Sequence, residues 1–474
     1  MSPALVEWLG QGWQPAAPMP HPASPSAAGP AARRREMLSS LFPGELVVVP
    51  SGQMQTRAND TQYPFRAASP FVWLTAETVE GAVLVMTPRP TGVGHDSALY
   101  VRTYHLPGSE GYFTDHQFGA VWVGNVPTPD ETAAVLGLPT RALADLPAAL
   151  APWRDQRCAV LQGVDHLVDP LLPHGTAERL APAIDELRLV KDEWEVQRLR
   201  EACGATARGF ADVVREIPRV LDRPLRGERW LEGTFWRRAR LEGNEVGYTS
   251  IVASGAHATT LHWWRNHGQL RSGDLLLADM GVETEAIHTA DVTRTMPLDG
   301  TWTPAQLRVY RAVLEAQEAG IEQARVGNDF LAAGRAALHV LADHLHSWGL
   351  IDVPADVSCS PDPDRPGAGR HRRFTLHGVS HSLGLDVHDC AQARSEAYTH
   401  GPLGANHVLT VEPGLYFQAN DLTVPAELRG IGVRIEDDIL VTPRGPVNLS
   451  AELPRDPDEL TAWMRHTQAT RSAP

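Results

Sequence analysis

The sequence predicts a smaller α/β domain followed by a larger α+β domain. Its 474 residues are enough for about two or three domains of the usual size. Up to about residue 180, short apolar runs alternate with helical stretches, which is typical of α/β structure. Beyond that point the order helix, helix, strands occurs twice, which indicates an α+β unit built from two related halves.

We expect four segments along the chain. Residues 1–32 are rich in proline and alanine and predict an extended arm without a core of its own. The α/β domain is expected over residues 33–182, and the larger α+β domain over residues 183–455. The remaining residues, 456–474, are expected to form a C-terminal tail.

Hydrophobic patterns place the elements within these domains. In the smaller domain, continuous apolar runs bounded by turn residues predict strands at 45–50, 71–76, 81–88 and 158–164. The larger domain opens with a long amphipathic helix from about Asp192 to Ile217, because apolar residues recur at three- and four-residue steps. Further helices are expected at 226–241, 304–325 and 328–348, before a last group of strands.

Composition and charge exclude several classes of function. Lys plus Arg total 42 against 57 Asp plus Glu, a net charge of −15, and a chain of that charge repels nucleic acid. The four cysteines are scattered, so neither a disulfide framework nor a thiolate zinc site is expected. The sequence has no apolar run of about 18 residues that would span a membrane. It also starts without a signal-peptide pattern, so we expect a cytoplasmic protein.

Two aspartates stand in predicted apolar strands. Asp279 interrupts DLLLADMG, and Asp291 lies in HTADVTRT twelve residues further on, which suits opposite arms of one hairpin that point to the same face. Two buried carboxylates side by side repel each other, so a proton or a cation must compensate them. The pair alone leaves two interpretations equally open: a metal site, or turn caps and an ion pair with Arg294.

A glycine-punctuated segment, HGVSHSLGLDVHD, contains His377, His381 and His388. Single histidines are commonly structural, but three in one such segment favour a functional site. Two glutamates in later predicted strands, Glu412 in LTVEPG and Glu436 in GVRIEDD, also have apolar neighbours. An ion pair between Glu436 and Arg434 on the same strand is the structural alternative for that glutamate.

Two aspartates, two glutamates and one histidine form a ligand set of hard oxygens with a single imidazole. Such a set favours manganese, with cobalt or zinc as alternatives, over metals that prefer thiolates. The carboxylates exceed what one metal needs if it keeps an open position, so we expect two divalent metal ions that share a water. A water activated in this way predicts hydrolysis as the reaction class.

The motifs HTADVTRT, HGVSHSLGLDVHD, TVEPGLYF and GIGVRIEDD resemble those of the pita-bread metallopeptidases, most closely aminopeptidase P and prolidase. The segment TRANDTQYPFRAASPFVWLT is similar to the N-terminal domain of aminopeptidase P. The resemblance covers about residues 33–448. It implies a C-terminal catalytic domain of the pita-bread (creatinase/aminopeptidase) fold after the smaller α/β N-terminal domain.

The resemblance also implies a role for each matching residue. The expected metal ligands are Asp279, Asp291, His381, Glu412 and Glu436. Asp279 would bind one ion and His381 the other, while Asp291 and Glu436 would bridge the two. Glu412 would also act as the proton shuttle for the attacking water. His262 and His388 match residues that act at the substrate carbonyl and the tetrahedral intermediate.

Five more residues match substrate-binding positions: His377, Tyr416, Arg434, Asp60 and Arg394. The first three would line the pocket for proline after the scissile bond. Asp60 matches an acidic position that reaches the substrate-side cleft of a neighbouring subunit in related oligomers. Arg394 would correspond to a substrate-binding arginine.

The chain departs from the family pattern in two places that bear on the site. The spacing of Asp279 and Asp291 is one residue longer than the family's common spacing, which predicts a bulge or a longer turn in the hairpin. Ser382 stands where a large residue commonly follows the ligand histidine, which would open the pocket wall.

The implied activity is that of an Xaa-Pro aminopeptidase, which removes the N-terminal residue from peptides with proline in the second position. Proline has no N–H, and its tertiary amide is closed to ordinary proteases. Prolidase, which cleaves only dipeptides at the same kind of site, stays open as an alternative. A non-catalytic pita-bread module that binds peptides or proteins, or a metal-free hydrolase, is disfavoured because all five ligands are present. The expected partners are peptides with Xaa-Pro N-termini and further copies of the chain in a homodimer or homotetramer, with no nucleic acid and no membrane.

Overall fold

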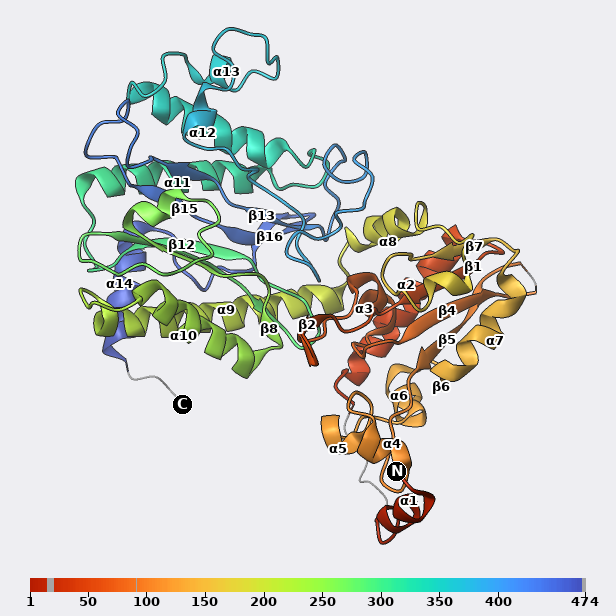
Figure 1. Cartoon of the computed structure of the whole chain (residues 1–474). Coiled ribbons are helices and arrows are strands. Elements are labelled where there is room, and N and C mark those ends of the chain that lie inside the picture. The colour runs from red at the N-terminus through yellow and green to blue at the C-terminus, as the bar shows by residue number, and fades with distance from the viewer. Residues whose placement is uncertain (15–20, 91, 471–474) are drawn as a thin grey trace. The chain divides into compact units, whose positions relative to one another are not determined.

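The computed structural model describes residues 1–14, 21–90 and 92–470. The chain divides into two compact units, Met1–Leu187 and Arg188–Pro474, each with its own sheets and helices (Figure 1). In the described part of the chain, no helix is both long and apolar enough to cross a membrane.

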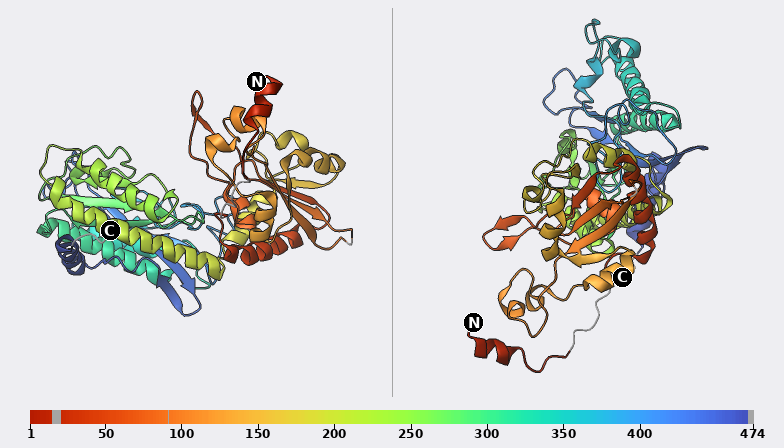
Figure 2. Two further views of the ribbon diagram at one scale, coloured as in Figure 1. Left: turned by 90° about the horizontal axis from the view of Figure 1, so that it is seen from below. Right: turned by 90° about the vertical axis from the view of Figure 1, so that its right-hand side faces the viewer.

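A five-stranded mixed sheet lies at the centre of the N-terminal unit, in the order β6-β5-β4-β1-β7. Its strands are β1 (Leu46–Pro50), β4 (Val83–Pro88), β5 (His95–Val101), β6 (Thr140–Ala142) and β7 (Cys158–Val160). Strand β1 pairs antiparallel with β4 and parallel with β7. Helix α2 (Ala28–Leu41) lies along one face of this sheet (Figure 2), where Ser39 Oγ and His95 Nδ1 are 2.7 Å apart. The mixture of strands and helices confirms the α/β class of this unit.

The remaining elements of this unit are short. The helices are α1 (Pro3–Leu9), α3 (Ser69–Thr75), α4 (Glu110–Thr114), α5 (Ala120–Val123), α6 (Pro129–Leu136) and α7 (Leu146–Leu150). Helix α8 (Leu180–Arg188) ends at the division between the units. Strands β2 (Thr56–Ala58) and β3 (Thr61–Gln62) form an exposed hairpin.

Residues 71–75 are helical, so the expected strand at 71–76 is wrong. They belong to α3, in which Phe71, Trp73 and Leu74 are almost completely buried. Periodicity cannot distinguish a short buried strand from a short buried helix when the apolar run is continuous. Pro70 in the first turn and the left-handed Ala76 (φ 61°) at the C-cap are the local features that bound the helix.

Described parts of the expected arm and tail form helices. Helix α2 begins at Ala28, inside the expected arm, and Ala31 within it is fully buried. Residues 15–20 of that arm lie outside the described residues. Residues 457–469 form helix α14 (Pro457–Ala469), and Leu460 and Met464 pack into the core of the C-terminal unit. Residues 457–469 are therefore not a free tail.

In the C-terminal unit, two helix pairs lie on opposite sides of the strands (Figure 1). One pair is α9 (Glu193–Val220) and α10 (Gly227–Glu242), and the other is α11 (Pro304–Gln323) and α12 (Ala332–Ser347). The short helix α13 (Ala355–Ser358) follows α12. A capping box at Asp192 and Glu195 begins α9, as the amphipathic pattern from Asp192 predicts.

The strands of this unit form two three-stranded sheets and two strand pairs. Strands β9 (Ile251–Ser254), β10 (Leu275–Met280) and β12 (Val292–Pro297) make the first sheet, in the order β12-β10-β9. Strands β13 (Val408–Val411), β16 (Asp437–Thr442) and β17 (Gly445–Asn448) make the second, in the order β13-β16-β17. The pairs are β8 (Glu245–Val246) with β11 (Val282–Glu283), and β14 (Gly414–Tyr416) with β15 (Gly432–Arg434). The repeated order of two helices followed by strands confirms the expected α+β unit.

Candidate metal centre

A cavity of about 620 Å³ in the C-terminal unit collects the carboxylates and histidines that the sequence singled out. Each carboxylate comes from the end of a strand: Asp279 lies in β10, Asp291 directly precedes β12, and Glu436 directly precedes β16. Glu412 directly follows β13. All four line the cavity together with His262, His377, His381 and His388.

The hairpin register places Asp279 and Asp291 on one face. Asp279 pairs with Thr293, and the same register continues to Glu283 and Thr289, so Asp291 lies two residues further along the same face. The additional residue of the spacing is taken up in the turn that follows, where Ile287 adopts a φ of 53°. Of the two possibilities that the spacing left open, a bulge or a longer turn, the hairpin has the longer turn, because its paired residues keep one register.

The ligand atoms of Asp291, His381 and Glu436 lie within 4.8 Å of one another. His381 Nε2 is 3.3 Å from Asp291 Oδ2 and 3.5 Å from Glu412 Oε1. Although burial disfavours its charged form, the hydrogen bond to Asp291 and the charge of Glu412 raise the pKa of His381 to about 9. The imidazole of His381 therefore lies within 3.5 Å of two carboxylates, those of Asp291 and Glu412.

The carboxylates strongly perturb one another. Burial, together with the charges of Asp291 and Asp279, raises the pKa of Glu412 to about 7. Burial and the charges of Asp291 and Glu412 raise the pKa of Glu436 well above its usual range. Burial also raises the pKa of Asp279, against the opposing effect of Arg434. A site of this kind disfavours several negative charges until a cation compensates them.

The residues fit divalent metal ions. Glu436 is 1% exposed, and its Oε1 atom has no hydrogen-bond partner among the residues that the structure describes. An unpaired buried carboxylate oxygen is strongly unfavourable, and a cation at this position would satisfy it. Carboxylate oxygens with one imidazole are the donors that Mn²⁺ and similar hard or borderline ions prefer.

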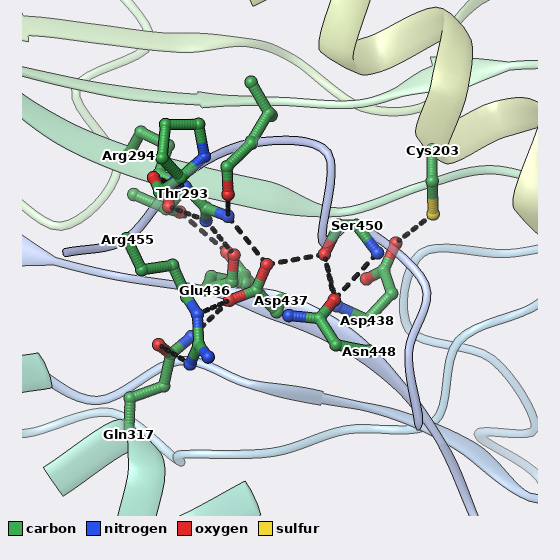
Figure 3. Close-up of polar contacts among 12 residues, drawn as sticks. Cys203, Thr293, Arg294, Gln317, Glu436, Asp437, Asp438, Asn448, Ser450 and Arg455 are labelled. Atoms are coloured by element: carbon green, nitrogen blue, oxygen red, sulfur yellow. Dashed lines mark hydrogen bonds and ion pairs between the residues drawn. The ribbon is translucent and has the colours of Figure 1, made fainter. Parts of the chain in front are cut away.

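Hydrogen bonds from behind hold the carboxylates in place (Figure 3). Thr293 Oγ1 donates to Glu436 Oε2 at 2.7 Å. The backbone N–H of Asp291 donates to Asp438 Oδ2 at 3.1 Å, and the thiol of Cys203 donates to the same oxygen at 3.2 Å. The cluster is therefore built on a second layer of polar groups, which orient metal ligands.

The ion pairs differ from those that the sequence suggested. Arg434 Nη2 donates to Asp279 Oδ2 at 2.6 Å, so its partner is not Glu436. Arg294 pairs with Asp437 at 2.7 Å rather than with Asp279 or Asp291. The sequence left open that Asp291 pairs with Arg294 and that Glu436 pairs with Arg434. Neither ion pair is formed between these described residues, because each arginine pairs with a different aspartate.

The histidines surround the carboxylates with different protonation preferences. His377 Nδ1 and the carbonyl oxygen of Gly378 are 2.8 Å apart, and His377 Nε2 lies 2.8 Å from the hydroxyl of Tyr416. Burial and the charge of Arg434 lower the pKa of His377 to about 4, so its ring is neutral at neutral pH. His388 lies 4.3 Å from His381 between ring centroids, and burial followed by the charge of His381 lowers its pKa.

Not every expected site residue lies at this cavity. Tyr416 contacts it through His377 and also accepts a hydrogen bond from Arg434 at 3.0 Å. Arg394 is exposed in the loop before β13 and is not among the lining residues. Asp60 is exposed at the tip of the β2–β3 hairpin in the N-terminal unit. The roles of Arg394 and Asp60 stay predictions.

Ser382 is not among the residues that line the cavity. It lines a separate small hollow with Phe330 and Tyr398, and its backbone N–H donates to the Tyr398 hydroxyl at 2.6 Å. The expectation that this position opens the pocket wall stays a prediction.

Sequence analysis missed several residues of the site. The Tyr248 hydroxyl donates to Asp279 Oδ1 at 2.6 Å, and Ile251, Leu261, Trp264 and Val387 give the cavity apolar walls. Nothing in the local pattern marks Tyr248, since its partner lies 31 residues away in the chain. The aromatic and aliphatic residues near His262 carried a usable signal, because ligand pockets combine apolar walls with a few polar groups.

A cavity that brings together four carboxylates at strand ends with four histidines from the loops, and fits divalent ions, is typical of metal-dependent hydrolases. Residues 197–443 match the model of metallopeptidase family M24, and residues 31–159 match that of the aminopeptidase P N-terminal domain. The chain therefore belongs to metallopeptidase family M24, whose members use divalent metal ions.

Similar proteins agree along nearly the whole chain. It is 48% identical over 447 residues to Xaa-Pro aminopeptidase 2 of Streptomyces coelicolor, which covers 94% of this chain and 93% of that protein. It is 31% identical over 461 residues to the Xaa-Pro aminopeptidase of Escherichia coli, covering 91% of this chain and 96% of that protein. The solved structure of E. coli aminopeptidase P with the inhibitor Pro-Leu superimposes with a TM-score of 0.80 at 29% identity, over 94% of this chain and 99% of that one. These matches confirm the pita-bread fold of the C-terminal unit.

Proposed function

We propose that this chain is an Xaa-Pro aminopeptidase, which hydrolyses the bond before a proline in the second position and releases the N-terminal residue. The observation that carries the proposal is the single cavity in which the five expected metal ligands meet His262, His377 and His388. The relatives at 47–48% identity carry this activity in their names.

The metal ligands are proposed to be Asp279, Asp291, His381, Glu412 and Glu436. Asp291 and Glu436 are the proposed bridging residues, while Asp279 and His381 would serve one ion each. Two bound divalent ions would polarise the scissile carbonyl and lower the pKa of the attacking water towards neutrality. We favour manganese, with cobalt or zinc as alternatives, because of the oxygen-rich donor set; a structure of zinc-substituted E. coli aminopeptidase P with product is among the similar structures.

The protein's own groups supply proton transfer and orientation. Glu412 is proposed to accept a proton from the attacking water and return it to the leaving amine. His262 and His388 are proposed to stabilise the developing charge at the substrate carbonyl. Neutral His377, with Tyr416 and Arg434, is proposed to position the proline ring.

Several finer points belong to the same proposal. Asp60 on its exposed hairpin is proposed to reach the cleft of a neighbouring subunit in a homodimer or homotetramer, and Arg394 to contact substrate. We also propose a cytoplasmic location.

Prolidase activity is the alternative at the same site. The relatives named Xaa-Pro aminopeptidases favour the aminopeptidase over the dipeptidase.

The test is hydrolysis of Ala-Pro-Ala beside Ala-Pro, each with added Mn²⁺ and with EDTA. Manganese-dependent cleavage of the tripeptide, with little cleavage of the dipeptide, is the expected result. A preference for the dipeptide would make the chain a prolidase. If neither peptide were cleaved while metal is bound, the chain would be a binding module.

A further inference from the structure

The loop between β9 and β10 carries two residues that line the cavity, His262 and Trp264. It begins with a short 3-10 helix, Gly255–Thr259, and is otherwise irregular. His262 is exposed, and its ring makes no hydrogen bond within the part of the chain that the structure describes. The position of this imidazole therefore depends on how the loop itself is held.

One buried carboxylate holds the loop at several points. Glu228, in the first turn of α10, is 0% exposed. Its Oε1 atom accepts a hydrogen bond from the backbone N–H of Ser254 at 2.9 Å and lies 2.7 Å from Nδ1 of His257. Its Oε2 atom accepts from the indole N–H of Trp263 at 2.9 Å and from the backbone N–H of Gly268 at 2.6 Å.

These contacts span the loop from one end to the other. Ser254 is the last residue of β9, and Gly268 lies fourteen residues further along, beyond His262 and Trp264. Trp263, whose indole bonds to Glu228, directly follows His262 in the chain, and its ring stacks on His257 with centroids 3.9 Å apart. A Cβ atom at residue 268 would lie 2.6 Å from the Glu228 carboxylate, so this close approach requires glycine.

The energetics favour a rigid arrangement. A buried carboxylate is stable only when its oxygens are hydrogen-bonded, and charge-assisted hydrogen bonds are roughly twice as strong as neutral ones. All four contacts of Glu228 go to the same loop, so the loop cannot move away without leaving this carboxylate unsatisfied.

We propose that Glu228 is a positioning residue for His262 and Trp264: it binds both ends and the centre of the loop 254–268 and thereby fixes their part of the cavity wall. The inference rests on the proposed function, in which His262 acts at the substrate carbonyl. Glu228 itself is not among the lining residues, so it acts through the loop and not on the substrate.

The test compares E228Q with E242Q. Glutamine keeps the volume of Glu228 but turns one acceptor oxygen into an NH₂ group that faces N–H donors. Glu242 is the matched control, because it lies at the other end of α10 and pairs with Arg208 and Arg238 instead of the loop. Three quantities are measured in each full-length variant: hydrogen exchange over residues 254–268, the affinity for Mn²⁺, and kcat and KM for Ala-Pro-Ala.

In E228Q we expect faster hydrogen exchange over 254–268 and a fall in kcat/KM of about 10- to 100-fold, the size of effect that a misplaced catalytic group gives. The affinity for Mn²⁺ should be unchanged, since no proposed ligand lies in the loop. E242Q should match the wild type in exchange and in turnover. Unchanged exchange in E228Q would overturn the inference.

A double-mutant cycle tests the connection to His262. If Glu228 acts through His262, the E228Q substitution lowers kcat/KM less in an H262A background than in the wild type. Fully additive losses would overturn this connection. E228D keeps the charge and both acceptor oxygens, so it should restore part of the exchange protection, and it carries the test if E228Q does not fold. The two proposals can fail separately. If the wild-type protein does not cleave Ala-Pro-Ala, the proposed function is refuted. If hydrogen exchange over 254–268 is nevertheless faster in E228Q, the positioning role is still supported.

Discussion

Glu436 and Asp437 are neighbours in the chain and are 1% and 0% exposed, yet their surroundings are opposite (Figure 3). Asp437 accepts hydrogen bonds from Arg294 at 2.7 Å, from the Ser450 hydroxyl at 2.6 Å and from the Gln317 amide at 2.9 Å. Glu436 faces the cavity, where one of its oxygens has no partner among the described residues.

The difference separates two uses of a buried charge. Asp437 is compensated by the protein itself, so its charge belongs to the fold. Glu436 lies among other carboxylates. Burial together with their charges raises its pKa well above the usual range, against the opposing charge of Arg434, and a proton or a bound cation would compensate it. A buried carboxylate without an internal partner is thus the stronger indication of a ligand site than a carboxylate in an apolar strand as such.

The substitution E436Q should give the largest effect on function. It removes a charge that the metal ions require, so we expect weaker Mn²⁺ binding and a loss of activity of about 1000-fold, equivalent to about 4 kcal/mol. The metal-free variant should unfold at a temperature close to that of the metal-free wild type, because the raised pKa of Glu436 keeps this carboxyl group protonated without metal and glutamine replaces one neutral group with another. Calorimetric titration, peptide hydrolysis and thermal unfolding in EDTA measure these quantities. Wild-type affinity for Mn²⁺ in E436Q would contradict the assignment.

The substitution D437N should act on the fold instead. It leaves Arg294 buried without its partner charge, which typically destabilises a protein by about 3–5 kcal/mol. Urea unfolding of the metal-free variant measures the loss, with metal-free E436Q as the comparison. If E436Q proved less stable than D437N without metal, the distinction between the two carboxylates would be wrong.

The pH dependence of unfolding of the metal-free protein should also distinguish a carboxyl group of the cavity, Glu412, from a carboxylate that the protein itself compensates, Asp389. The raised pKa of Glu412, about 7, stabilises the folded state below the unfolded pKa of about 4.3, and this contribution is lost as the pH rises through 7. In EDTA, the unfolding temperature should therefore fall from about pH 5 to about pH 8, and less steeply in E412Q. A flat or rising profile of the metal-free wild type would contradict this prediction.

The pKa of Asp389 is shifted in the opposite direction to that of Glu412. Burial alone would raise its pKa, but the charges of Arg188 and Lys191 outweigh burial and hold the pKa of Asp389 well below its usual range. Such a group stabilises the fold above the unfolded pKa of about 3.9 and loses its contribution only in stronger acid. Its effect thus lies below the window in which Glu412 titrates.

The substitution Y248F should give the smallest of these effects. It deletes the hydroxyl that donates to Asp279 at 2.6 Å, and removing such an orienting hydrogen bond typically lowers metal affinity about 10- to 100-fold. The control is Y310F, since the Tyr310 hydroxyl donates to the carbonyl of Arg455 in the same unit. Equal Mn²⁺ affinities for Y248F and Y310F would show that Tyr248 has no orienting role.

The sequence predicted the elements of the C-terminal unit well, because their signals are local. Helix α9 begins at Glu193, directly after Asp192, where the amphipathic pattern placed its start. The helix α3 was missed because a buried apolar run has no distinguishing period. The carboxylates at the strand ends could also be found from the sequence, because each is a charged residue within or beside an apolar run.

The partners of the site residues could not be predicted in the same way. Arg434 pairs with Asp279, which lies 155 residues earlier, and Glu228 reaches Gly268 across 40 residues. Such pairs depend on the packing of elements, which one sequence does not contain. For the same reason the sequence did not show that Ser382 lines a separate small hollow with Phe330 and Tyr398.

Lys191, which pairs with Asp389, is the only lysine of this sequence, and it is 1% exposed. An acylating reagent therefore reaches this amine only when the contact between Lys191 and Asp389, next to His388, opens. Because no other lysine contributes a background, the rate of labelling at Lys191 would report that opening directly, as a chemical measure of local unfolding beside the cavity. The rate with and without metal would then show whether the ions close this part of the chain.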